Sequence, residues 1–197
     1  MTDANSLLRR GLLLEYMTVA WNVVGTVVVM VAAMAAHSVA LTGFALDSLV
    51  EIGASTVVVW QLKGRQVHRE GPALRFIAVA FFALALYIAA QSAHTLWLAL
   101  RPQPSLPGIL WLALTLGAML ALAAGKHRTG IRLDNLVLQT EARVTLIDAY
   151  LAAAVLLGLV LNAWVGWWWA DPLAGLVIVV YGMREGAHAW HDAECRA

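Results

Sequence analysis

The chain has 197 residues, of which 61% are hydrophobic and 13% are charged, and its mean hydropathy is +0.75. A soluble domain is nearer half apolar and a quarter charged, so this composition excludes one and indicates a membrane protein. The single cysteine excludes a disulfide framework and a cysteine-based metal cage, and the net charge of +1, from 13 basic and 12 acidic residues, indicates no nucleic-acid partner.

The apolar runs of the chain predict an all-α membrane protein with six transmembrane helices. A helix needs about 20 predominantly apolar residues to cross the bilayer. In chain order, the predicted helices cover about 11–36, 38–62, 76–100, 106–125, 142–164 and 172–189. So few residues remain outside these spans that we expect a single transmembrane domain over residues 1–197 and no soluble domain.

The basic residues indicate how these helices are oriented, because Lys and Arg accumulate in cytoplasmic loops. Twelve of the 13 lie before the first span, between the second and third, between the fourth and fifth, or near the chain end: Arg9, Arg10, Lys63, Arg65, Arg69, Arg75, Lys126, Arg128, Arg132, Arg143, Arg184 and Arg196. The alternate connections hold only Arg101. Both termini are therefore expected in the cytoplasm, and Trp164 with the tryptophans at 167–169 is expected at the outer interface, where indoles anchor helices.

Acidic residues inside the predicted spans indicate a functional site, because a carboxylate in hydrocarbon is costly and usually faces the protein interior. Asp47 and Glu51 are four residues apart on one helical face, and Asp148 on the fifth span can reach the depth of Glu51, near the middle of the bilayer. We expect no Lys or Arg within the spans at that depth. The three acids therefore predict a divalent cation site or a proton site; protonated acids that hydrogen-bond neighbouring helices are the alternative.

Other polar residues extend this prediction. On the first helix, Glu15 and Asn22 share a face, and Glu141 lies at the cytoplasmic mouth of the fifth helix. Each is a candidate additional ligand or pathway residue; for Asn22 an interhelical hydrogen bond is an equal alternative. Near the C-terminus, His188, His191 and Asp192 have a spacing that permits metal collection in the cytoplasm, although a solvated helix end also explains them.

Three stretches resemble the cation diffusion facilitator family. Residues 38–51, SVALTGFALDSLVE, resemble its second-helix signature, which places Asp47 and Glu51 at two metal-ligand positions. The stretch EARVTLID at 141–148 resembles the fifth-helix counterpart, with Val144 and Asp148 at its ligand positions, and GWWWADP at 166–172 is similar to the start of the family's sixth helix. Val144 supplies no ligand, and the family's C-terminal cytoplasmic domain is missing, so the chain resembles a membrane-only member.

The resemblance implies a transporter that exchanges a divalent metal cation for protons and exports it from the cytoplasm. It also implies a homodimer and a 3+3 arrangement of helices with inverted topology. The all-oxygen set Asp47, Glu51 and Asp148 suits iron, manganese or cobalt, while the prevalence of zinc in the family makes zinc the best single expectation. The metal is cargo, and no cofactor is expected. We expect the chain in the plasma membrane of a bacterium.

Two other functions fit some of these features. A metal-binding regulatory membrane subunit would bind without transport. An intramembrane aspartyl protease would use two aspartates from different helices, but the G-x-G-D setting of such enzymes is absent at Asp47 and Asp148. We therefore expect a transporter rather than an enzyme.

Overall fold

The computed structural model describes residues 2–62 and 70–195, and within these ranges it contains six α-helices and no strand. The helices are α1 (Thr2–Ala36), α2 (Val39–Leu62), α3 (Glu70–Trp97), α4 (Leu106–Arg132), α5 (Leu136–Val165) and α6 (Ala170–Cys195). The predicted fold class is confirmed. Of the basic residues used to orient the chain, Lys63, Arg65, Arg69 and Arg196 lie outside the described residues.

The helices extend beyond the predicted spans at the end where α1 begins and α6 ends. For example, α4 continues to Arg132 rather than ending near Gly125, and α5 begins at Leu136 rather than near Ala142. Hydropathy marks the part of a helix that faces hydrocarbon, whereas helical hydrogen bonding continues through polar flanking residues. At this end all of the described helices except α2 therefore extend beyond the predicted spans, and which part of each helix crosses the membrane stays a prediction.

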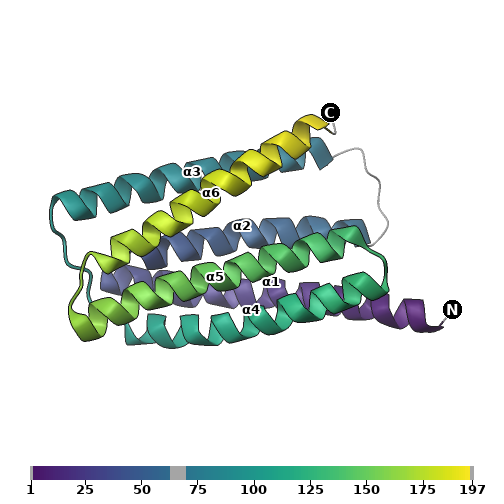
Figure 1. The fold of residues 1–197 in the computed structure, drawn as a ribbon, viewed down its shortest axis with the longest axis horizontal. Coiled ribbons are helices and arrows are strands. Elements are labelled where there is room, and N and C mark those ends of the chain that lie inside the picture. The colour runs from purple at the N-terminus through teal and green to yellow at the C-terminus, as the bar shows by residue number, and fades with distance from the viewer. Residues whose placement is uncertain (1, 63–69, 196–197) are drawn as a thin grey trace.

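Figure 1 shows two groups of helices. Helices α1, α2, α4 and α5 pack side by side, and we call them the four-helix core. Helices α3 and α6 form a pair on one side of it, where α6 contacts both α2 and α5. Phe44 and Leu41 of α2, Ile88 of α3 and Ile178 of α6 are buried in the largest hydrophobic cluster. The first residues of α1 and the last of α6 lie at the same end, as an even number of crossings requires.

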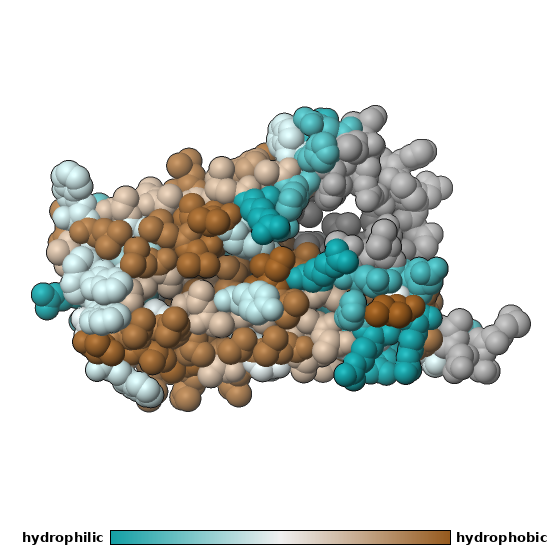
Figure 2. Space-filling model, viewed as in Figure 1, coloured by the Kyte–Doolittle hydropathy of each residue, from teal (hydrophilic) through white to brown (hydrophobic). Residues whose placement is uncertain are grey.

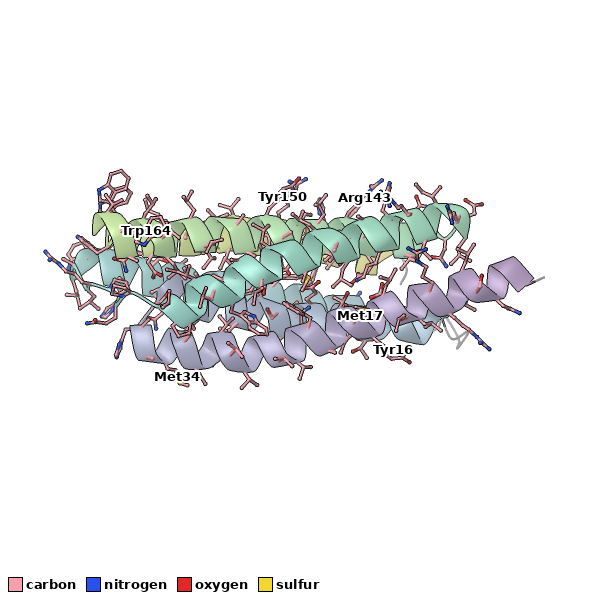
Figure 3. All side chains as sticks on the ribbon, turned by 90° about the horizontal axis from the view of Figure 1, so that it is seen from below. Tyr16, Met17, Met34, Arg143, Tyr150 and Trp164 are labelled. Carbon is pink, nitrogen blue, oxygen red and sulfur yellow. The ribbon has the colours of Figure 1, made fainter. Side chains whose placement is uncertain are left out.

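Four helices are long and apolar enough to cross a membrane, over Asn5–Ala36, Ala78–Trp97, Leu106–Arg132 and Glu141–Val165. The remaining two, α2 and α6, have 24 and 26 residues and lie alongside these four. In Figure 2, hydrophobic side chains cover most of the visible length, and hydrophilic ones gather toward the end with the termini. Trp164, which is 84% exposed, projects from the opposite end (Figure 3). The chain is an integral membrane protein.

At that opposite end, the first turn of α6 is fastened to the first turn of α2. Asp171 is fully buried and accepts hydrogen bonds from the hydroxyl of Ser38 and from the backbone amides of Val39 (3.0 Å) and Ala40 (3.4 Å). Ser38 in turn accepts from the amide of Leu41 at 3.1 Å. These bonds satisfy amides that have no partner within their own helix. Asp171 of the GWWWADP stretch thus caps a helix 133 residues earlier in the chain.

The connection from α5 to α6 depends on two glycines. Gly166 ends α5 in a left-handed conformation with φ 72°, which glycine adopts without steric cost. Gly158 lets the two helices approach closely, since a Cβ atom there would lie 2.8 Å from the Cβ of Ala174 and 3.0 Å from the carbonyl oxygen of Ala170. Small residues at such crossings are typical of membrane helices.

Candidate cation site

Asp47 and Glu51 of α2 and Asp148 of α5 lie next to one another inside the protein, and we call them the central acid cluster. Their exposed fractions are 4%, 6% and 3%. Each of the three carboxyl groups lies within electrostatic range of another, so that their negative charges repel one another. The four-residue spacing on α2 and the neighbouring position of α5 thus bring together the acids that the sequence singled out.

Several oxygens of this cluster lack a donor. Oε1 of Glu51 and both carboxyl oxygens of Asp148 are buried without a hydrogen-bonding donor among the described residues. Asn22 of α1, itself 2% exposed, donates from Nδ2 to Oε2 of Glu51 at 2.9 Å. In the described part of the chain, no three His, Cys, Asp or Glu side chains lie close enough together to hold a metal ion. The acids are therefore neighbours with free lone pairs, and their described positions do not yet form a metal site.

A second group of buried charges lies in the four-helix core toward the end where α1 begins and α6 ends. Nζ of Lys126 lies 3.1 Å from Oε2 of Glu15 and 3.5 Å from Oε1 of Glu141, and it donates to Oγ1 of Thr145 at 3.0 Å. Ser55 donates from Oγ to Oε1 of Glu141 at 3.0 Å. These five residues come from α1, α2, α4 and α5, and we call them the Lys126 network. Lys126 and Glu15 are fully buried.

Lys126 places a basic side chain inside the helix bundle, where it pairs with Glu15 and Glu141 rather than with the central acids. The expectation of no Lys or Arg at the depth of the central acids stays a prediction. Lys126 belongs to α4 rather than to a loop, because the helix runs seven residues past Gly125. It extends a stripe of buried α4 residues spaced by three and four: Leu112, Thr115, Met119, Leu122, Lys126 and Thr129. Continuing that spacing past the apolar run would have predicted its burial. The positive-inside rule alone, which treats Lys126 as a loop charge, does not predict this burial.

The three candidate additional ligands therefore have different surroundings. Asn22 reaches the central acid cluster, whereas Glu15 and Glu141 share the ammonium of Lys126. Arg143, which follows Glu141 closely in sequence, is exposed and points away from the bundle (Figure 3). Val144 is half-buried one turn before Asp148 and offers no ligand atom.

Near the end of α6, the histidines suggested for metal collection are exposed. Nδ1 of His188 lies 3.7 Å from Oε1 of Glu185, one turn earlier on the same helix. His191 is also exposed, and the side chain of Asp192 lies outside the described part. His188 therefore lies beside Glu185, an acid that the sequence analysis did not single out.

Sequence reasoning also passed over Tyr181 of α6. Its ring packs edge-on against Phe81 of α3, with centroids 6.0 Å apart. Its hydroxyl interacts electrostatically with all three central acids and with Glu185. Tyr181 also borders a groove of about 510 Å³ between α5 and α6, whose other lining residues include Tyr150 and Arg184. A tyrosine in an apolar run gives no sequence signal of this position.

Comparison with known proteins identifies the family of the chain. Residues 73–190 match the family described as the cation efflux transmembrane domain. This part contains Asp148, Lys126 and Glu141 but not α2 with Asp47 and Glu51. The chain is also 25% identical over 195 residues to transmembrane protein 163 of Xenopus laevis, an alignment that covers 92% of this chain and 68% of the relative.

Proposed function

The chain belongs to the cation efflux family, and from this premise we propose that it exports a divalent metal cation from the cytoplasm in exchange for protons. Membership of the family supports a transporter of cations rather than an enzyme. The observation that carries the proposal is the central acid cluster. Asp47, Glu51 and Asp148 are buried together in the four-helix core, and oxygens of Glu51 and Asp148 have no donor among the described residues.

The cluster supplies only oxygen ligands. Carboxylates suit manganese, iron(II) and other hard or borderline divalent ions, whereas zinc is held more selectively where nitrogen or sulfur ligands are present. Asn22 orients one Glu51 oxygen, in the way that outer hydrogen bonds commonly orient metal ligands. We propose a site of broad selectivity with zinc as its first substrate and with iron, manganese and cobalt also accepted.

Protons are the natural counter-ion for such a site. Two acids on one helix face and a third from α5 cannot remain charged together in a buried position without a compensating cation. A divalent cation supplies that compensation, and its ligands must be deprotonated to bind it. When the cation leaves, protons restore neutrality, so cation release and proton uptake are coupled at the same three side chains.

Reconstituted proteoliposomes test this proposal. A pH gradient should drive zinc or manganese across the membrane, with proton movement in the opposite direction. Asp47→Asn replaces a charged ligand with a neutral side chain of nearly identical shape. It should reduce cation flux to the level of protein-free liposomes. The matched control is Asp134→Asn, which removes an exposed carboxylate from the connection between α4 and α5 and should leave the flux unchanged.

Three other results would contradict the proposal. Metal binding without flux would favour the regulatory subunit, and flux without proton movement would exclude antiport. Equal flux in wild type and Asp47→Asn would remove the central acid cluster from the pathway.

The proposal also covers assembly and location. We expect the transporter to act as a homodimer in the plasma membrane of a bacterium, with both termini in the cytoplasm. There His188, His191 and Asp192 would collect cations, and the contact between His188 and Glu185 supports such a role for the end of α6. Cross-linking in the membrane measures the oligomeric state, and His188→Ala with His191→Ala should raise the cation concentration at half-maximal flux.

A further inference from the structure

The Lys126 network already encloses a cation. Around the ammonium of Lys126 lie carboxylate oxygens of Glu15 and Glu141 and the hydroxyl of Thr145, at 3.1, 3.5 and 3.0 Å. Ser55 supports Glu141 from α2. All four helices of the core contribute to this enclosure, and every ligand atom is oxygen. An oxygen shell that carries two carboxylates is also the kind of shell that holds hard divalent ions.

The enclosure has unused coordinating capacity. Oε1 of Glu15 is buried without a hydrogen-bonding donor among the described residues, although Glu15 is fully buried. A single ammonium carries one positive charge between two carboxylates, so a divalent ion would balance the pair more completely. Burial of an incompletely satisfied carboxylate costs free energy. Where a native protein retains such a group, a functional role is a common reason.

The network lies between the central acid cluster and the cytoplasmic end of the core. Glu141 precedes Asp148 by seven residues, and Glu15 precedes Asn22 by seven, in helices that both rise from the cytoplasmic end. On descending α2, Ser55 follows Glu51 by four residues. At 1.5 Å per residue, these intervals place the network about 6–10 Å nearer the cytoplasm.

For a cation to enter, Lys126 has to leave the enclosure. Its ammonium stands on a flexible four-carbon stem, and such side chains can redirect the charged group toward water while the stem stays on the protein. Helix α4 ends six residues later, at Arg132, and Thr129, which follows Lys126 on the same stripe, is buried. The ammonium therefore reaches solvent only when the stem moves past Thr129 toward that end.

We propose that Glu15, Glu141 and Thr145 form a second divalent-cation site on the cytoplasmic side of the central acid cluster, with Lys126 as its tethered occupant. A cation that arrives from the cytoplasm displaces the ammonium, rests between Glu15 and Glu141, and passes on to the central acid cluster. The ammonium then returns and closes the path behind it. This sequence rests on the proposed export function, whereas the existence of the second site does not.

Manganese binding to the purified, detergent-solubilised chain tests the second site independently of the proposed export function. The background is Asp47→Asn with Glu51→Gln and Asp148→Asn, which removes all three carboxylates of the central acid cluster. In that background, Lys126→Met should gain about one tightly bound Mn²⁺ per chain over the version with Lys126, measured by equilibrium dialysis and elemental analysis. Adding Glu15→Gln and Glu141→Gln should remove the gained ion.

Two results would overturn the second site: no gained Mn²⁺ in the Lys126→Met version, or a gain that persists after Glu15→Gln and Glu141→Gln. Lys126→Gln retains a donor for one carboxylate and replaces Lys126→Met if that variant is not monodisperse with native helical content. Because the central acids are absent throughout, failure of the proposed transport site cannot produce either result.

Discussion

The central acid cluster and the Lys126 network are built from similar residues on the same four helices, but their charges are balanced differently. Glu15 and Glu141 share the ammonium of Lys126, whereas, in the described part of the chain, no ammonium lies within ion-pairing distance of Asp47, Glu51 or Asp148 and Asn22 donates to Glu51. In the Lys126 network the protein itself therefore balances part of the negative charge. The central acids have no such fixed charge and depend more fully on a mobile cation or proton.

The largest expected difference between the two regions is in transport. Asp148→Asn removes a carboxylate that has no partner cation and should reduce metal flux to the level of protein-free liposomes. Glu141→Gln removes one whose partner, Lys126, is still paired with Glu15, so it should slow the flux without abolishing it. Proteoliposome uptake of zinc or manganese measures both, and equal loss in the two variants would mean that the regions do not differ in this way.

The second comparison concerns stability. Lys126→Met leaves Glu15 and Glu141 buried without their cation and should destabilise the fold by about 3–5 kcal/mol. Asp148→Asn removes a charge from an unpaired cluster and should cost little or even stabilise. Thermal unfolding in detergent, followed by circular dichroism, compares the variants. Recovery of stability when Glu15→Gln and Glu141→Gln are added to Lys126→Met would attribute the loss to unpaired charge rather than to packing.

The amide of Asn22 provides a finer test of the central acid cluster. Asn22→Leu keeps the side-chain volume but removes the donor to Glu51, which then loses its fixed orientation. Loss of such an outer hydrogen bond typically weakens metal binding by roughly 10- to 100-fold. Zinc affinity measured by competition with a chelating dye should fall within that range. Unchanged affinity would mean that the bond to Asn22 breaks before the metal binds.

The smallest expected effect is a change in selectivity. Val144→His places an imidazole one turn before Asp148 and adds a nitrogen ligand to an all-oxygen set. Zinc should gain over manganese by about tenfold, which corresponds to about 1.4 kcal/mol. A competition flux assay with both metals measures the ratio, with Val144→Leu as the control for side-chain size. An unchanged ratio would place Val144 away from the bound cation.

The sequence was sufficient for the helices and for the acids that face inward. Six apolar runs, a one-sided distribution of Lys and Arg, and acids in lipid-length spans each have a direct physical meaning. The four-residue spacing of Asp47 and Glu51 was enough to place both on one face. Proximity of Asp148 followed from depth alone, because the topology makes α2 and α5 run in opposite directions.

The charge balance at Lys126 could not be predicted by the same rules. From sequence, a lysine just after an apolar run can be either an exposed charge in a loop or the next member of a buried helical stripe. Only the short distances from Lys126 to Glu15 and Glu141 show that it is buried. The pairing of α3 with α6 was also hidden. Large apolar side chains such as Leu86 of α3 and Val180 of α6 are exposed on faces that resemble the buried ones in composition, so hydropathy does not mark a contact face.

Asp171 gives the molecule a fixed end. Its hydrogen bonds join the first turns of α2 and α6, so these helices cannot separate there without exposing backbone amides and a buried carboxylate. Their other ends, beyond Glu51 and Tyr181, have no comparable bond between the two helices in the described residues. We expect this joint to act as a hinge, so that a small rotation about it would become a larger displacement at the end of the molecule where α2 ends and α3 begins.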